Sequence, residues 1–125
     1  MKMKAIIYDG KKLIEKEWEN DSYDFLRESV EGYIERIPLR DLDERNIDMW
    51  CNEEGKFRDL ETTILLNYDG KIYDNVVGNV VFTKNKDGET IGLTDDDIKY
   101  IKNKFMDDGY YIDLKNNKMI QVLDF

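Results

Sequence analysis

The side chains that most enzymes use for nucleophilic chemistry are scarce in this sequence. The 125 residues include no histidine, one cysteine (Cys51) and two serines, Ser22 and Ser29. Without histidine, neither a Ser–His nor a Cys–His pair can activate a nucleophile, and no G-x-S-x-G motif surrounds either serine. A lone cysteine also excludes an intramolecular disulfide, so we expect Cys51 to be a buried thiol in a reducing compartment, the cytoplasm.

Metal and phosphate sites are not indicated either. Residues 85–88 resemble the centre of a calcium loop, but Thr83 and Thr94 stand where its first and last acidic ligands should be. The acidic run 95–97 could bind magnesium, although carboxylates are also favoured at a helix N-terminus without any metal. Neither GxGxxG nor GxxxxGK[ST] occurs. We therefore expect no metal and no cofactor.

Acidic residues are so numerous that no single carboxylate pair is informative. A pair of carboxylates can perform acid–base catalysis, but with 28 Asp and Glu residues some pair always looks suggestive. Since no specific catalytic motif occurs, we predict that the protein is not an enzyme and assign no catalytic residues.

The charge balance points to the kind of partner instead. The net charge is −9, from 28 acidic and 19 basic residues. This charge repels phosphates and anionic lipids, so we expect no direct binding to nucleic acid or membrane, and a basic protein as partner. Solubility alone could also explain it. The candidate partner-binding residues are Asp41, Asp43, Glu44, Glu53, Glu54, Asp95, Asp96 and Asp97.

The strands that must position these acids follow from short apolar runs and turn signals. Strands are predicted over residues 3–8 and 12–18, over 33–39, around Met49 and Trp50, and over 76–83. The last run is almost continuously apolar, which is typical of a central strand covered on both faces. Residues 40–46 are predicted to form a loop, and residues 57–68 fit either strand or helix.

Two helices and a final hairpin complete the prediction. The first helix begins at a cap among residues 20–22 and ends at Gly32, and the second begins at Thr94 and ends at Gly109. Residues 110–114 and 119–125 are predicted to pair as a hairpin. Since hairpins dominate, we expect one α+β domain, residues 1–125, with a mostly antiparallel sheet and two short helices packed on it.

The order of these motifs resembles a known family. It includes Lys4–Ile7, Val30–Glu35, Asn52–Lys56, Val77–Val81 and Leu93–Ile98. Together they resemble the DUF3846 family, small uncharacterised proteins of bacteria, phages and other mobile elements, over roughly residues 4–100. The stretch after Lys56 and the terminal hairpin depart from the pattern. The resemblance implies a mobile-element setting and transfers no catalytic residue.

Three functions remain open at this point. The first is an inhibitor of a bacterial defence or nucleic-acid-handling protein, such as an anti-CRISPR factor, whose acids occupy a basic channel of the target. The second is a module that binds or sequesters a nucleotide signal, suggested by the aromatic residues and by Gly78 and Gly92, with Lys84 and Lys86 as the nearest basic pair. The third is a homo-oligomer, for instance a homodimer, that pairs through an exposed edge strand, for which the terminal strand is the candidate.

Overall fold

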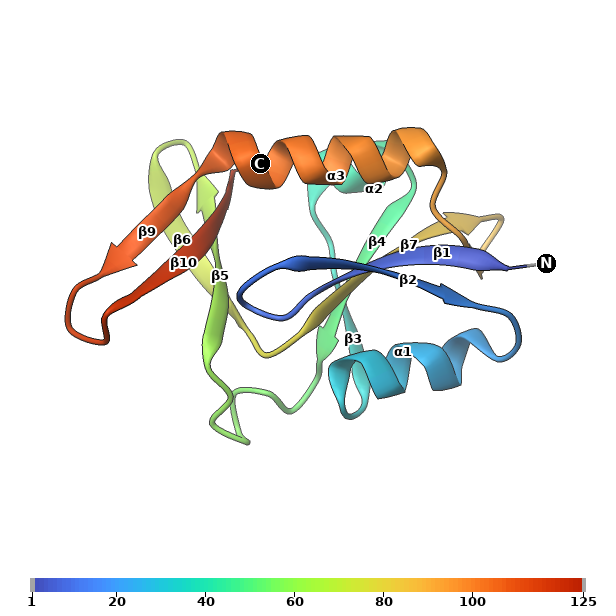
Figure 1. Ribbon diagram of the computed structural model, residues 1–125, viewed down its shortest axis with the longest axis horizontal. Helices are drawn as coiled ribbons and strands as arrows, with labels where there is room; N and C mark the ends of the chain where they lie inside the picture. Colours follow the sequence, from blue (N-terminus) through green and yellow to red (C-terminus); the bar gives the residue numbers. More distant parts are fainter. Residues whose placement is uncertain (1, 125) are drawn as a thin grey trace.

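The computed structural model describes residues 2–124, which form two β-sheets and three helices (Figure 1). The larger sheet has the order β2-β1-β7-β4-β3, with β8 paired to β7, and all its pairs are antiparallel. Its strands are β1 Met3–Tyr8, β2 Leu13–Trp18, β3 Ile34–Ile37, β4 Ile47–Asn52, β7 Val80–Lys86 and β8 Glu89–Ile91.

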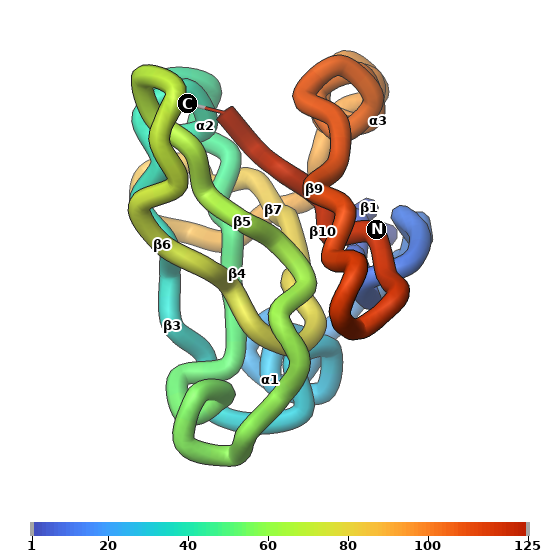
Figure 2. The backbone as a smooth tube through the Cα atoms, turned by 90° about the vertical axis from the view of Figure 1, so that its left-hand side faces the viewer, coloured from blue at the N-terminus to red at the C-terminus, as the bar shows by residue number. Residues whose placement is uncertain are grey.

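The smaller sheet has the order β6-β5-β10-β9 and lies against one face of the larger one (Figure 2). Its strands are β5 Thr62–Tyr68, β6 Lys71–Val77, β9 Tyr110–Asp113 and β10 Lys118–Asp124. The pair β5–β10 is parallel, whereas β5–β6 and β9–β10 are antiparallel. The α+β class and the predominance of antiparallel pairing are thereby confirmed.

Two apolar clusters hold these layers together. The larger cluster lies between the sheets and includes Phe82, Ile64 and Leu123, together with residues of α2 (Arg40–Glu44) and α3 (Asp95–Asp108). The smaller cluster joins α1 (Ser22–Val30) to the other face of the larger sheet, with Val81 at its centre. Strand β7 is therefore covered on both faces, as its apolar run predicts.

The single strand predicted over residues 76–83 is in fact two strands. Strand β6 belongs to the smaller sheet and β7 to the larger, and the chain crosses between them at Gly78 and Asn79. Gly78 has φ +73°, a conformation that glycine adopts without steric cost. A Cβ there would also lie 2.8 Å from Leu60 Cδ1. The prediction was wrong because an apolar run does not show that the chain changes sheets within it.

The loop predicted over residues 40–46 is mostly the short helix α2, so residues 2–124 form three helices rather than two. Leu39 and Leu42 are buried in the main core, and the Asp43 N–H donates to the Leu39 carbonyl at 2.8 Å. Burial of these two leucines stabilises a helix that is too short to show a periodic pattern.

Both predicted helix starts are confirmed. Asp21 caps α1, and Thr94 caps α3 in a reciprocal capping box with Asp97. Helix α1 ends at Val30, and its C-cap is Glu31 in the left-handed conformation (φ 62°), one residue before the predicted stop at Gly32. No helix of residues 2–124 is long and apolar enough to cross a membrane.

The terminal strand is not a sheet edge. Strand β10 pairs with β9 on one side and β5 on the other, so the free edges of the smaller sheet are β9 and β6. The predicted hairpin itself is confirmed as β9–β10, with Phe125 outside the described residues. Self-association through an edge strand stays a prediction, but the terminal strand proposed for it is an interior strand.

Candidate functional site

Helix α1 presents a polar face to solvent because its apolar face is fixed to the larger sheet. Leu26 and Val30 are buried, and the rings of Phe25 and Trp18 stack with their centroids 4.7 Å apart. The Asp21 carboxylate accepts hydrogen bonds from the backbone N–H groups of Tyr23 and Asp24, which starts the helix.

The turn after β4 is bonded to the C-terminal end of α1. The Asn52 side-chain amide donates to the Val30 carbonyl at 3.1 Å, and the Glu53 N–H donates to the Tyr33 carbonyl at 2.8 Å. Arg58 Nη1 donates to the Glu31 carbonyl at 2.7 Å. Residues 19–35 and 53–59 therefore form one continuous region, which we call the α1 surface, at the lower end of the molecule in Figures 1 and 2.

Negative charge is concentrated on the α1 surface. It has six acids and one base in residues 19–35, and three acids and two bases in residues 53–59, which makes −6 of the chain's net −9. The nine acids are all exposed, and none forms an ion pair within residues 2–124. They are Glu19, Asp21, Asp24, Glu28, Glu31, Glu35, Glu53, Glu54 and Asp59.

The three bases of the α1 surface have other partners. The Arg27 guanidinium lies 4.9 Å from the centroid of the Tyr33 ring and 5.7 Å from that of Tyr23. Arg58 donates to a backbone carbonyl, and Lys56 pairs with Asp74 at 3.1 Å. The nine carboxylates therefore carry charge that no neighbouring side chain neutralises directly.

Aromatic side chains are exposed among these acids. Phe57, in the turn after β4, is 93% exposed, and Tyr33 and Tyr23 are about half exposed. An exposed ring surrounded by charge is the usual composition of a protein-binding surface, in which an aromatic anchor is buried on association. A hollow of about 300 Å³ adjoins Phe57, with Glu35, Glu53 and Lys56 among its other lining residues.

The structure separates the acids predicted to bind a partner. Glu53 and Glu54 belong to the α1 surface, whereas Asp41, Asp43 and Glu44 lie on α2 at the opposite end of β4 (Figure 1). Strand β4 has six residues, so roughly 20 Å separates its ends. The α2 acids are also less available, because two of them form ion pairs and Asp41 is half-buried.

Two of the three acids at the start of α3 have structural partners. Asp95 pairs with Lys4 at 3.2 Å, while Asp96 is exposed. Asp97 is buried and binds Lys84 Nζ at 3.0 Å, in addition to accepting the Thr94 N–H. Burial opposes ionisation of Asp97, but these hydrogen bonds outweigh it and lower the pKa of the carboxyl. Asp97 is therefore not a surface acid.

Six of the nine acids on the α1 surface come before β4 along the chain, and the sequence interpretation did not select them. The available signal was their density, since residues 19–35 contain six acids against Arg27 alone. What it could not show is that the turn with Glu53 and Glu54 folds back onto the same helix.

Other candidates from the sequence have structural explanations. Cys51 is buried, as predicted, and burial raises the pKa of its thiol to about 11. Gly92 lies against the β1 backbone, where a Cβ would be 2.7 Å from the Lys4 nitrogen. The glycine is therefore explained by packing against β1, and not by contact with a ligand. Lys84 is occupied by Asp97. No metal-binding group of three or more His, Cys, Asp or Glu residues gathers within residues 2–124.

The fold defines a small α+β protein in which the smaller sheet, α2 and α3 cover one face of the larger sheet and α1 covers the other. The chain matches the model of the family described as domain of unknown function (DUF3846) over residues 3–106, and it belongs to this family. No curated protein and no solved structure matches the chain. The C-terminal hairpin lies beyond the matched residues.

Proposed function

We propose that this protein acts, without catalysis, by binding a basic protein through the α1 surface. The observation that carries the proposal is a group of nine exposed carboxylates at one end of the molecule. None of the nine forms an ion pair within residues 2–124, whereas ten of the other 19 acids do. Unpaired charges of one sign repel each other, and a partner of opposite charge relieves that repulsion.

Charge and apolar contact have separate roles in this proposal. The carboxylates speed the encounter and select a basic partner, because their field extends about 8–10 Å at physiological salt. Phe57, Tyr33 and Tyr23 supply the apolar area that makes the complex last, with Phe57 as the anchor because it is 93% exposed.

The more specific proposal is inhibition of a nucleic-acid-handling protein. A surface that binds DNA or RNA phosphates is basic, and nine clustered carboxylates present it with a competing array of negative charge. A bacterial defence protein in the cytoplasm fits this description, with the inhibitor encoded by a phage or another mobile element, as an anti-CRISPR factor would be. Family membership and charge support this setting by association only.

The test compares charge reversal on and off the α1 surface. Partners are captured from a bacterial lysate with the tagged protein, identified, purified and titrated by calorimetry at two salt concentrations. We expect the triple variant Glu28→Lys, Glu53→Lys, Glu54→Lys to lose at least about tenfold in affinity at low salt, since three attractive pairs become repulsive. Phe57→Ala is expected to lose a similar factor that does not depend on salt.

The matched control is Asp69→Lys, Asp96→Lys, Asp107→Lys. These acids are also exposed, form no ion pair within residues 2–124 and produce the same change in net charge, but they lie outside the α1 surface. The proposal is wrong if both triple variants bind equally well. It is also wrong if the captured partners are acidic, or if nucleic acid does not compete with the protein for the partner when inhibition is measured.

A further inference from the structure

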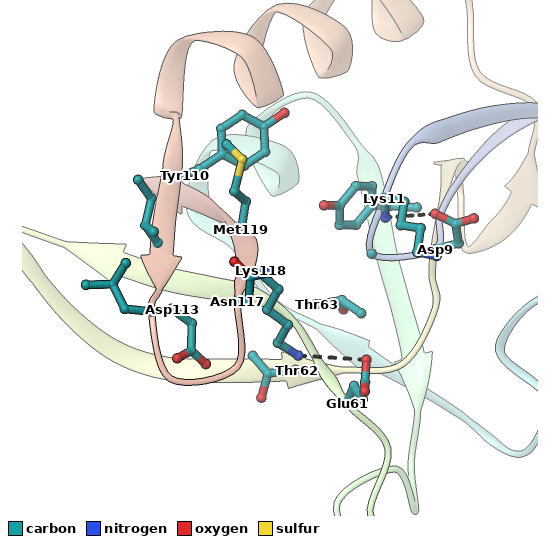
Figure 3. Close-up of a pocket in the computed structure, with 14 residues that line it drawn as sticks. Asp9, Lys11, Glu61, Thr62, Thr63, Tyr110, Asp113, Asn117, Lys118 and Met119 are labelled. Atoms are coloured by element: carbon teal, nitrogen blue, oxygen red, sulfur yellow. Dashed lines mark hydrogen bonds and ion pairs between the residues drawn. The ribbon is translucent and has the colours of Figure 1, made fainter.

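A cleft opens between the β1–β2 turn and the C-terminal hairpin, away from the α1 surface (Figure 3). Its volume is about 670 Å³, within the usual range of small-molecule sites. Tyr8, Gly10 and Lys11 line one side, and residues of β5, β9 and β10 line the other. Three segments that are distant in the sequence therefore meet at one hollow.

Tyr8 is the buried polar group of this cleft. Tyr8 is 3% exposed, and its ring packs edge-on against the Phe105 ring with the centroids 5.0 Å apart. The hydroxyl has no hydrogen-bond partner among residues 2–124, whereas every fully buried side-chain nitrogen or oxygen there has one. The hydroxyl is thus the part of Tyr8 that reaches the cleft. Burial, together with Tyr110 and Asp9, raises the pKa of this phenol to about 12, which keeps it protonated and able to donate.

The facing wall is apolar and open to water. Met119 is paired with Ile112, and Gln121 with Tyr110, so Met119, Ile112 and Tyr110 project from the same side of the β9–β10 hairpin. Ile112 is 62% exposed, and the other two are more than half exposed. Figure 3 shows Tyr110 and Met119 beside each other at the upper end of this wall. A ligand with an apolar body would remove these side chains from water.

Two hydrogen-bond donors are left free in the cleft, and the second Asp9 oxygen and the Asn117 side chain also have no partner within residues 2–124. The Asp9 carboxylate already accepts the N–H groups of Lys11 and Lys12, and Glu61 pairs with Lys118 at 3.7 Å. Asp113 accepts hydrogen bonds from Asn116. The Lys11 ammonium forms no ion pair within the described chain, and the Tyr8 hydroxyl is free as described above. A ligand group that accepts hydrogen bonds and carries negative charge would match the Tyr8 hydroxyl and the Lys11 ammonium.

We propose that the cleft is a binding site for a small organic anion with a planar, apolar body, such as an aromatic acid or a nucleotide. Its anionic group accepts from Tyr8 and Lys11, and its body lies against Tyr110, Ile112 and Met119. The site shares no residue with the α1 surface, so its existence does not depend on the proposed protein partner.

The test uses 2-naphthoate as the probe and neutral 2-naphthylmethanol as its matched control. Titration of the ¹⁵N-labelled protein with naphthoate, followed by NMR, is expected to shift the amides of Gly10, Lys11, Thr63 and Met119, with a Kd of about 1 mM or tighter. Tyr8→Phe and Lys11→Gln are each expected to weaken binding about three- to tenfold. Tyr8→Phe keeps the ring against Phe105, and its NMR spectrum shows whether the fold is intact.

The variants Tyr73→Phe and Lys71→Gln, on the edge strand β6 outside the cleft, are expected to bind naphthoate as the wild type does. The proposal is overturned if naphthoate shifts no cleft amide at 5 mM, roughly five times the expected Kd. It is also overturned if the β6 variants weaken binding as much as Tyr8→Phe, or if the neutral alcohol binds as tightly as the anion.

Discussion

At the residue scale, two buried carboxylates have pKa shifts of opposite direction. Asp97 accepts hydrogen bonds from Lys84 and from the backbone of Thr94, and its pKa is lowered. Asp48 accepts one from Asn85 at 3.1 Å and lies 3.6 Å from Arg36, and burial raises its pKa. The two residues therefore have opposite effects on stability as pH changes.

Asp97→Asn is expected to lower the free energy of unfolding by about 2 kcal/mol at pH 7, because Lys84 loses its counter-charge beside a buried cap. The folded pKa is lowered, so this contribution is present above the unfolded pKa of about 4 and is lost as pH falls through the folded value. Urea unfolding from pH 2 to 7 measures it. A difference between wild type and variant that stays constant with pH would contradict this account.

Asp48→Asn is expected to raise the free energy of unfolding at pH 7 by about 1 kcal/mol, because the wild type holds a buried charge that its neighbours only partly compensate. Here the folded pKa is raised, so the wild-type carboxyl stabilises below the unfolded pKa, and that stability is lost as pH rises through the folded value. The difference in the free energy of unfolding between Asp48→Asn and the wild type should vanish below about pH 4. The same urea series measures it, and a variant less stable than wild type at pH 7 would contradict the interpretation.

At the scale of elements, the segment before α3 is fixed to β1. The Leu93 N–H donates to the Lys4 carbonyl at 2.8 Å, and Gly92 lies directly against the β1 backbone. This contact sets the position from which α3 begins. The glycine is needed here for space, since its φ is outside the left-handed region.

Gly92→Ala is therefore expected to cost about 2–3 kcal/mol of stability, because a Cβ would lie 2.7 Å from the Lys4 nitrogen and 2.9 Å from the Met3 Cα. Gly88→Ala is the comparison. Gly88 has φ +85° but open space around it, so only backbone strain of about 1 kcal/mol is expected. Thermal unfolding of both variants shows which of them loses more stability. A loss of stability for Gly92→Ala that is equal to or smaller than that for Gly88→Ala would show that β1 can move aside.

At the scale of the whole molecule, the C-terminal hairpin completes the smaller sheet although it lies outside the family match. Leu123 is buried in the main core, and Gln121 is buried where its amide donates to the carbonyls of Phe105 and Gly109 at the end of α3. Without β10, the inner edge of β5 and the last turn of α3 would lose their partners.

A chain ending at residue 108 is accordingly expected to lose cooperative unfolding. Removal of several large buried side chains at about 2–5 kcal/mol each is comparable to the total stability of a domain this size. Circular dichroism during heating and the dispersion of the NMR spectrum measure the outcome. A truncated chain that unfolds in one sharp transition near the wild-type temperature would show that the hairpin is dispensable.

Much of the local structure could be predicted from the sequence, because its causes are local. Asp21 and Thr94 cap the helices that follow them, and the turn at Asp9–Gly10 joins the first two strands. Family membership was also visible in the order of motifs. The net charge of −9 and the absence of histidine are properties of composition alone. The absence of histidine excludes histidine-dependent chemistry whatever the fold.

The tertiary structure decided which residues act together, since that depends on contacts between distant parts of the chain. It divided the apolar run 76–83 between two sheets and placed β10 in the interior of one of them. It buried Asp97 and brought Glu53 and Glu54 to the acids around α1. It also placed the Tyr8 hydroxyl opposite a hairpin about a hundred residues further along. Spacing along the chain encodes helix caps and turns, whereas a binding surface arises from side chains that only the packed sheets bring together.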